Sequence, residues 1–441
     1  MGQTKARTLK GFRDYLPEVE IPRTRMLRRV VQVFEAFGFS PLATPAIEYA
    51  DILLGKSGDE GDKLLYRFED NGGRDVALRY DLTVPLARVV AQYANLDKPF
   101  KRYQIAPVWR AEKPARGRFR EFVQCDIDIV GEASVRADAE CMMVGLEVLA
   151  ACEVPAYEMR INHRGILHGM LDRAAIDDET QRMTALRALD KLDKMGKEKV
   201  VNELETVVGL DASAIAKLFE VVERPVEGIS GLKELQVFFS DYERGKAGAE
   251  SLTELVTILE EAGYSERVRV DLSIARGLDY YTGTVYETFI VGHEEYGSVM
   301  SGGRYDEMIG QYSKQGQPAV GICLGVDRLI SALQDMGLLT QETGTADVFV
   351  TLFDAADYGS NAAFARSLRD VGLSVELSMS AKKLGKQFKA AERQGCRFVV
   401  MIGDDERSQQ VVQIKDMNSG EQHQVGASDA PGWLRERVLG R

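Results

Sequence analysis

Residues 276–287 read Arg-Gly-Leu-Asp-Tyr-Tyr-Thr-Gly-Thr-Val-Tyr-Glu and join two segments that carry the apolar alternation of β-strands. Gly277 and Gly283 have no Cβ, so a ligand can approach the backbone closely at both positions. Arginine presents a planar fork that matches a carboxylate or a phosphate, and tyrosine hydroxyls both donate and accept hydrogen bonds. The stretch is therefore a candidate binding turn within a sheet. The alternative is an ordinary turn that happens to be rich in Tyr and Arg.

A second pair of predicted strands, 100–110 and 119–130, flanks a basic loop at 111–118. Along the later strand, polar and aromatic side chains recur with a period of two and therefore share one face. A face that points into water would more often carry Lys, Thr or Ser, so this composition favours a binding surface over a solvated face. The residues on that face are Phe122, Gln124, Asp126 and Asp128.

Two predicted helix N-termini also carry polar side chains. Asp81 and Thr83 come just before a helix marked by Pro85, where they fit either helix caps or a site for a substrate ammonium. Arg328 falls in the first turn of a helix that follows an apolar strand at 318–324. Because a helix N-terminus favours anions, Arg328 would reinforce a phosphate site, with a surface salt bridge as the alternative.

Composition limits the classes of protein that remain. A length of 441 residues predicts two or three domains, and a net charge of −12 argues against a general nucleic-acid coat while allowing a local basic surface. No run of 18 apolar residues occurs, and the first residues lack a secretory signal, so we expect a cytosolic protein without a membrane span. The five scattered cysteines predict reduced thiols, and His163 and His168 are expected to be structural.

The C-terminal part alternates between strand and helix patterns and predicts a separate α/β domain. A charged helical module at about 172–262 and a linker at 336–346 precede it. One helix of the C-terminal domain, near 382–394, presents a continuous basic face. This face indicates either a solvated surface or a polyanion contact. Its cations are Lys382, Lys386, Lys389 and Arg393, with Arg397 next along the chain.

Several stretches together resemble the class II aminoacyl-tRNA synthetases. Arg-Ala-Glu at 110–112 with its basic loop is similar to their motif 2, Gly-Val-Asp-Arg at 325–328 to motif 3, and the region of Pro45 to motif 1. Three further stretches resemble the signature of the histidyl-tRNA synthetase family. They are Arg-Gly-Leu-Asp-Tyr-Tyr at 276–281, Arg-Tyr-Asp-Leu-Thr-Val-Pro at 79–85 and Gln-Cys-Asp-Ile-Asp at 124–128.

The resemblance extends from Lys10 to Met417 and implies the fold class. We expect an α+β catalytic domain with an antiparallel six-stranded class II synthetase sheet, a helical insertion, and a C-terminal anticodon-binding α/β domain with a mixed sheet. The expected boundaries are 1–335 for the catalytic domain, with the insertion at about 172–262, then the linker 336–346 and the anticodon-binding domain 347–441. A cytoplasmic homodimer is implied as well.

The same resemblance implies how L-histidine is held. Asp81, Thr83 and Gln124 would bind its α-ammonium group, and Asp128 and Tyr281 would read its imidazole. An imidazole presents one donor and one acceptor, which a carboxylate and a hydroxyl can satisfy. The expected histidine-binding residues are Asp81, Leu82, Thr83, Arg110, Gln124, Asp128, Arg276, Tyr280 and Tyr281.

For catalysis the resemblance implies Arg110 and Arg276, which would flank the histidine carboxylate and the α-phosphate of ATP. Phe122 would stack on adenine, Glu112 would accept from its amino group and Arg328 would hold the γ-phosphate. Mg²⁺ is expected on the outgoing pyrophosphate. The resemblance therefore implies that the chain is a histidine–tRNA ligase.

The implied macromolecular partner is tRNA(His), whose terminal adenosine receives the histidyl group. In the motif 2 loop this chain has Ala115 where many bacterial members have glutamine. The alternative function is a non-catalytic, synthetase-like regulatory subunit of histidine biosynthesis. Such subunits lack the C-terminal domain and usually degrade the Arg276 motif, and both are present here. The candidate tRNA contacts are Arg116, Arg118, Lys382, Lys386, Lys389 and Arg393.

Overall fold

The structure is a computed structural model that describes residues 4–54, 64–114, 119–275, 280–313, 316–339 and 342–440. The chain forms two compact units. One contains the residues up to Arg13 together with Arg28–Met336, and the other contains Asp14–Leu27 together with the residues from Gly337 onward. No helix in the described ranges has both the length and the apolar character that crossing a bilayer requires.

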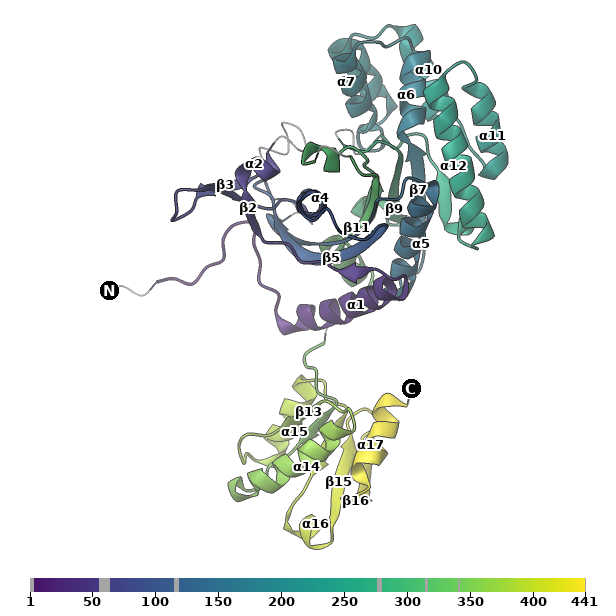
Figure 1. Cartoon of the computed structure of the whole chain (residues 1–441). Helices are drawn as coiled ribbons and strands as arrows, with labels where there is room; N and C mark the ends of the chain where they lie inside the picture. The colour runs from purple at the N-terminus through teal and green to yellow at the C-terminus, as the bar shows by residue number, and fades with distance from the viewer. Residues whose placement is uncertain are drawn as a thin grey trace. The chain divides into compact units, whose positions relative to one another are not determined.

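An eight-stranded sheet forms the centre of the first unit (Figure 1). Its order is β1-β5-β6-β11-β10-β9-β7-β8, and every pairing from β5 to β7 is antiparallel. The expected six-stranded antiparallel sheet is thus confirmed, and it is extended at its edges by β1 and β8, which pair in parallel. The strands are β1 Ser40–Pro41, β5 Phe100–Trp109, β6 Glu121–Val130, β7 Tyr157–His163, β8 Val268–Val270, β9 Thr284–Ile290, β10 Met300–Arg304 and β11 Ala319–Gly325.

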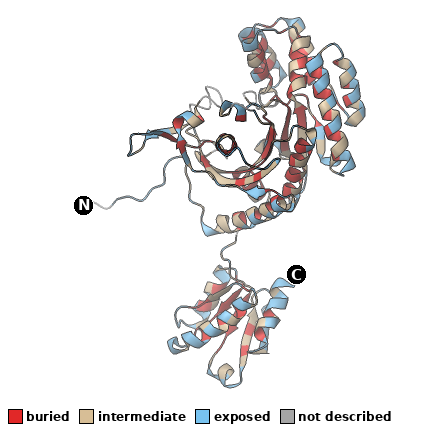
Figure 2. Cartoon of the chain, in the orientation of Figure 1, coloured by how far each residue is buried: buried red, intermediate tan, exposed pale blue. Residues whose placement is uncertain are grey.

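Helices cover both faces of this sheet. On the outer face, α5 (Val135–Ala151) packs so closely that a Cβ at Gly145 would lie 2.8 Å from Ile322 and from Met300. On the inner face, α4 (Thr83–Gln92) lies within the curve of the strands and shares a core with Val130 and Ala319 (Figure 1). The central strands β6, β9, β10 and β11 are therefore mostly buried (Figure 2). The polar residues of β6 line a pocket in this sheet.

The apolar pattern at 26–37 predicts a helix that Pro22 opens, but the N-terminal helix α1 spans Pro17–Ala36, so the predicted start was wrong. Pro17 already fills the first-turn position that proline favours, and Glu18 and Glu20 suit the positive end of the helix. Pro22 therefore lies inside the helix. After α1, Pro41 ends the short edge strand β1, as the proline pattern predicts.

A small sheet of order β2-β4-β3 contains a β-hairpin over residues 66–78, and the Glu-Asp-Asn-Gly-Gly sequence at 69–73 is the local turn signal that predicts it. Its turn is closed by Asp70, whose carboxylate accepts hydrogen bonds from the backbone N–H groups of Gly72 and Arg74. The elements here are β2 Ile47–Tyr49, α2 Ala50–Leu53, β3 Tyr66–Glu69 and β4 Asp75–Leu78.

The helical module between β7 and β8 begins at Arg164, earlier than expected, because His163 ends β7 and caps the next helix by accepting from the Gly165 N–H. Two long helices of the module, α6 and α12, approach at Gly169 and Gly245, where a Cβ on either would clash. The helices are α6 Arg164–Arg173, α7 Glu179–Leu189, α8 Leu192–Met195, α9 Lys197–Glu203, the π-helical turn Leu204–Val208, α10 Ala212–Val222, α11 Gly228–Phe238 and α12 Glu243–Glu261.

The C-terminal sheet has the order β13-β12-β14-β15-β16, with parallel pairing from β13 to β14 and antiparallel pairing beyond, so the expected mixed sheet is confirmed. The sequence analysis did not anticipate α16, β16 or α17, although Leu434 of α17 completes the buried core. The elements are β12 Val348–Val350, α14 Tyr358–Asp370, β13 Val375–Leu377, α15 Leu384–Arg393, β14 Phe398–Met401, α16 Asp404–Ser408, β15 Val411–Asp416, β16 Gln422–Gly426 and α17 Ala430–Leu439.

Candidate functional site

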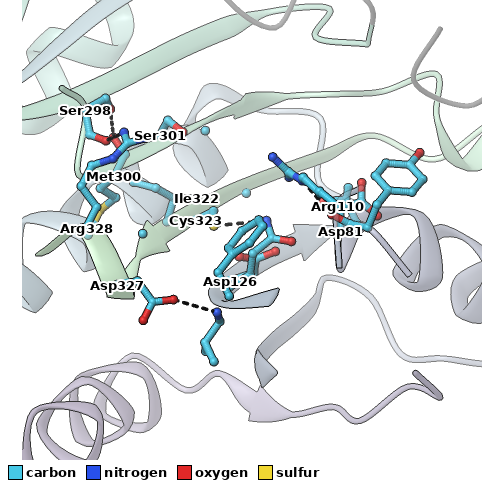
Figure 3. A pocket seen from close by; sticks show the side chains of 18 of the residues that line it. Asp81, Arg110, Asp126, Ser298, Met300, Ser301, Ile322, Cys323, Asp327 and Arg328 are labelled. Carbon is cyan, nitrogen blue, oxygen red and sulfur yellow. Dashed lines mark hydrogen bonds between the residues drawn. The ribbon is translucent and has the colours of Figure 1, made fainter. Parts of the chain in front are cut away.

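A pocket of about 550 Å³ opens on the inner face of the eight-stranded sheet. In Figure 3, Arg328 and Ser298 lie at one side of the pocket and Arg110 with Asp81 at the other, with Asp126 and Cys323 between them. Most of its polar lining comes from β6, β10, β11, the start of α4 and the start of α13 (Val326–Asp335). The polar and aromatic lining residues are Tyr80, Asp81, Thr83, Arg110, Glu112, Phe119, Phe122, Gln124, Asp126, Asp128, Tyr280, Tyr281, Ser298, Ser301, Tyr305, Cys323, Asp327 and Arg328.

The register of three strands sets which side chains meet on the floor of this pocket. Asp128 on β6 lies opposite Arg102 on β5 and opposite Gly321 on β11. A Cβ at Gly321 would lie 2.1 Å from Oδ1 of Asp128, so only glycine leaves room for this carboxylate. Two residues earlier on the same face, Asp126 lies opposite Cys323. The Gly302–Gly303 pair lies within β10.

Asp128 is held from two sides. The Arg102 guanidinium is fully buried, and its Nη2 lies 2.6 Å from Oδ2 of Asp128. The Tyr305 hydroxyl donates to Oδ1 of the same carboxylate. Arg102 Nη2 also donates to the carbonyl of Leu82 at 3.3 Å. Arg102 therefore connects the floor of the pocket to the segment that leads into α4.

Burial shifts the protonation of the carboxyl groups in this pocket. It raises the pKa of Asp126 to about 7 and the pKa of both Asp81 and Asp128 to about 6. The positive charge of Arg102 opposes the shift at all three groups. The negative charges of Asp128 and Asp81 add to the shift at Asp126. The pocket is therefore short of positive charge, and a cationic ligand would relieve the repulsion among these carboxylates.

Asp81 and Thr83 do lie at the N-terminus of α4. Oδ1 of Asp81 accepts from the Val84 backbone N–H at 3.2 Å, as in a helix cap, and the same side chain lines the pocket. The two interpretations of Asp81 are thus compatible, because a carboxylate can accept several hydrogen bonds. Leu82 is fully buried and does not line the pocket, so it offers only its backbone.

Arg110, at the end of β5, is positioned by its own neighbours. Its Nε donates to the carbonyl of Tyr80 at 3.1 Å, and its guanidinium lies 4.9 Å from the centre of the Phe122 ring. Stacking of a guanidinium on an aromatic ring keeps both groups in place. Glu112 also lines the pocket. This side of the site therefore offers an aromatic surface, a cation and an acceptor together.

Arg328 lies in the first turn of α13, as predicted, and its Nη1 donates to the carbonyl of Ser298. The preceding residue, Asp327, accepts from the Val123 backbone N–H at 3.2 Å and pairs with Arg13 at 2.7 Å. These contacts fix the start of α13 against β6. The other side of the pocket therefore has a cation beside a helix N-terminus, an arrangement that suits phosphate.

The rings of Tyr280 and Tyr281 lie 4.3 Å apart between centroids and line the pocket. Burial raises the pKa of both hydroxyls, so both remain protonated and able to donate at neutral pH.

Three predicted site residues, Arg276, Arg116 and Arg118, lie outside the described residues, as does Ala115.

The basic residues of the C-terminal unit line a separate, open hollow there. Lys382 was expected on the basic helix near 382–394. Helix α15 begins only at Leu384, so Lys382 lies before the helix. Arg397 lies beyond the helix and pairs with Asp416 at 3.5 Å, which removes it from the basic face. Lys386, Lys389 and Arg393 remain on the face, and with Lys382 they line the hollow.

Two residues that the sequence analysis did not single out belong to the site: Arg102 and Tyr305. Asp126 was placed by the strand period on the polar face of β6 but was given no role, although it stands between two assigned residues. Arg102 and Tyr305 had no such signal, since they reach Asp128 across strands that are distant in sequence.

The histidines and cysteines noted in the sequence have no place in the pocket lining, except Cys323. His163 caps α6, and burial lowers the pKa of both His163 and His168 to about 4. All five cysteines are free thiols. Across the described ranges, no cluster of three His, Cys, Asp or Glu side chains is arranged to hold a metal ion.

Comparison with known proteins identifies two parts of the chain. The model of a family described as "Histidyl-tRNA synthetase" matches residues 11–329, and the model of a family described as "Anticodon binding domain" matches residues 354–437. Together the two matches cover both units of the structure.

Curated relatives and solved structures resemble the chain over nearly its whole length. A histidine–tRNA ligase of Rhodopirellula baltica is 44% identical over 98% of both chains, and one of Helicobacter hepaticus is 42% identical over 96% of both. The crystal structure of histidyl-tRNA synthetase from Nostoc sp. PCC 7120 has a TM-score of 0.90 at 35% identity and covers 99% of this chain and 100% of its own. A protein of Bacillus halodurans described as an ATP phosphoribosyltransferase regulatory subunit/histidyl-tRNA synthetase shares the fold at 23% identity and a TM-score of 0.74.

Proposed function

Because the chain belongs to the histidyl-tRNA synthetase family, we propose that the pocket on its eight-stranded sheet forms histidyl-adenylate from L-histidine and ATP. The chain then transfers the histidyl group to the 3′ end of tRNA(His), which makes it a ligase that forms an aminoacyl-tRNA. The observation that carries this proposal is that one pocket gathers Asp81, Gln124, Asp128, Arg110 and Arg328 from separate parts of the chain.

The site suits histidine because it pairs an acidic floor with tyrosine hydroxyls. Asp81, Thr83 and Gln124 bind the α-ammonium group in the proposed complex. Asp128 and Tyr281, with Tyr280 beside it, satisfy the donor and the acceptor of the imidazole. A site of buried polar groups rejects amino acids that leave those groups unpaired, by factors of roughly 10⁴ or more.

Adenylate formation requires an in-line attack. An oxygen of the histidine carboxylate forms a bond to the α-phosphorus of ATP, and the bond from that phosphorus to the bridging oxygen of the β-phosphate breaks, so pyrophosphate leaves. Arg110 neutralises charge on the carboxylate and the α-phosphate, and Arg276 is proposed to do so from the opposite side. Guanidinium groups that are already held in place stabilise this charge without reorganising.

ATP is proposed to bind along the rest of the pocket. Phe122 stacks on the adenine, on the ring face that the Arg110 guanidinium does not cover, and Glu112 accepts from the adenine amino group. Arg328 binds the γ-phosphate beside the N-terminus of α13. Mg²⁺ bound through the phosphates of ATP would neutralise the outgoing pyrophosphate.

The remaining assignments concern the whole molecule. Residues 1–335 are proposed as the catalytic domain with its insertion, 336–346 as the linker and 347–441 as the anticodon-binding domain, in a cytoplasmic homodimer. The tRNA is proposed to contact the motif 2 loop and the C-terminal hollow. The proposed tRNA contacts are Arg116, Arg118, Lys382, Lys386, Lys389 and Arg393.

Histidine-dependent exchange of labelled pyrophosphate into ATP, measured without tRNA and beside the other amino acids, tests the proposal. Exchange with histidine alone is the expected result. Binding of histidine without any exchange would instead support the alternative, a non-catalytic regulatory subunit of histidine biosynthesis. The ligase is favoured because the curated relatives of nearly full length are histidine–tRNA ligases.

A further inference from the structure

Three buried acceptors on one face of β6 have no hydrogen-bond donor among the described residues, and one of them, Oδ2 of Asp128, is held in an ion pair with Arg102 at 2.6 Å. The other two have no such partner. Oδ1 of Asp126 and Oε1 of Gln124 each have no hydrogen-bond partner there, although Asp126 is only 4% exposed and Gln124 only 9%. Both side chains line the pocket, two positions apart on the strand. Buried acceptors are normally satisfied, so this pair calls for a ligand that brings several N–H donors.

The neighbouring carboxylate differs in this respect. Oδ1 of Asp128 accepts from the Tyr305 hydroxyl, and Oδ2 accepts no hydrogen bond but lies 2.6 Å from Nη2 of Arg102 in an ion pair, so a protein cation already lies beside this carboxylate. Asp126 is hydrogen-bonded to the Cys323 thiol, which lies opposite it on β11, and its Oδ1 has no partner among the described residues. Of the two carboxylates on this face, Asp126 therefore has the greater capacity to accept from a ligand.

We propose that Asp126 is a histidine-binding residue that accepts a hydrogen bond from the α-ammonium group of the substrate, together with Gln124. This inference rests on the proposed function of the pocket. An ammonium group has three donors, which matches the acceptors of Gln124 and Asp126 on β6 and the carboxylate of Asp81 at the start of α4. Asp126 thus takes the place of Thr83 among the direct acceptors of the ammonium group.

Charge and position favour the ammonium group over the imidazole. Asp81 and Asp126 line the same pocket. Asp81 also lies within the electrostatic range of Arg110, the proposed partner of the histidine carboxylate. The ammonium and the carboxylate of histidine are attached to the same carbon, so the ammonium must lie near Arg110. Figure 3 shows Asp81 beside Arg110, with Asp126 on the pocket side of both.

The test compares Asp126→Asn with the wild-type chain in pyrophosphate exchange. We expect the KM for histidine to rise by about 10- to 100-fold, the range for a lost hydrogen bond to a charged group, and the KM for ATP to stay unchanged. Asp370→Asn makes the same chemical change on the exposed surface of α14 and is the matched control. If Asp126→Asn does not fold, Asp126→Ser is measured in the same way.

A second ligand distinguishes the two ends of histidine. 3-(Imidazol-4-yl)propionate has the imidazole and the carboxylate but no ammonium, and it should inhibit the wild type and Asp126→Asn with equal potency. Equal losses for histidine and this analogue would show that Asp126 contacts the imidazole and would overturn the assignment, as would an unchanged KM for histidine. Absence of exchange in the wild type would instead reject the proposed function, whatever the variant does.

Discussion

The guanidinium of Arg102 on β5 and the carboxylate of Asp128 on β6 face each other across the sheet, with Nη2 2.6 Å from Oδ2 and both side chains buried. This pair is the only ion pair between fully described residues that places a wholly buried arginine beside the pocket. It partly neutralises three carboxyl groups whose pKa values burial has raised. Four predictions test this arrangement and the surfaces around it.

Arg102→Met should destabilise the first unit by about 3–5 kcal/mol, because it leaves the buried Asp128 without its charge partner. The free energy of unfolding in urea, followed by a probe in that unit, measures the effect. Adding Asp128→Asn should restore part of the stability, since the double variant no longer buries an unpaired charge. A single variant as stable as the wild type would show that the pair does not offset the carboxylates.

Gly321→Ala should lower kcat/KM for histidine by about 100-fold, because the new Cβ would lie 2.1 Å from Oδ1 of Asp128 and displace the carboxylate. Pyrophosphate exchange at varied histidine concentration measures this loss. Gly359→Ala is the matched control, since a Cβ there meets no atom within 4 Å. If both alanine variants had wild-type kinetics, the close contact would have no role in recognition.

Stability should depend on pH through the carboxyl groups of the pocket. The pKa of Asp126 rises from 3.8 to about 7 in the folded chain, so its contribution to stability is complete below pH 3.8 and is lost as the pH rises through about 7. Asp81 and Asp128 act in the same direction up to about pH 6. The buried His163 and His168 act oppositely, because their pKa values are lowered from 6.5 to about 4.

The difference between two proteins isolates the effect of Asp126 from these other groups. The free energy of unfolding of the wild type, minus that of Asp126→Asn, should decrease between about pH 4 and pH 7. Saturating histidine should reduce this slope, because a bound cation favours the ionised carboxylates. A difference that is constant across this range would show that Asp126 does not titrate there.

Charge reversal of Lys386 and Lys389 to Glu should weaken aminoacylation of tRNA(His) by roughly 10-fold and leave pyrophosphate exchange intact. Both lysines line the hollow of the C-terminal unit, and neither lines the pocket on the eight-stranded sheet. The slope of log affinity against log salt should fall by about two. Arg366→Glu, on the exposed surface of α14, is the control for general charge effects, and a simultaneous loss of exchange would make the basic face structural.

The strands and most helices were predictable because their signals are local. Alternation along 100–110 and 119–130 gave β5 and β6 almost to the residue, and the turn after Glu69 gave its hairpin. The errors have local causes too: Pro17 and Pro22 both suit a first turn, so the sequence could not choose between them. The missed α17 lacks a clear apolar stripe, and its burial depends on the rest of its unit.

The sequence by itself determined the family and the candidates Asp81, Arg110, Gln124 and Arg328, because the motifs that identify them are local, and the resemblance to the family implied the six antiparallel strands. Only the tertiary structure decided that Tyr305 donates to Asp128, that Arg102 pairs with it, and that Oδ1 of Asp126 has no hydrogen-bond partner among the described residues. Those contacts depend on the register between strands that are far apart in sequence, and burial at that junction sets the pKa of each carboxyl group. Neither the register nor the burial can be read from local pattern.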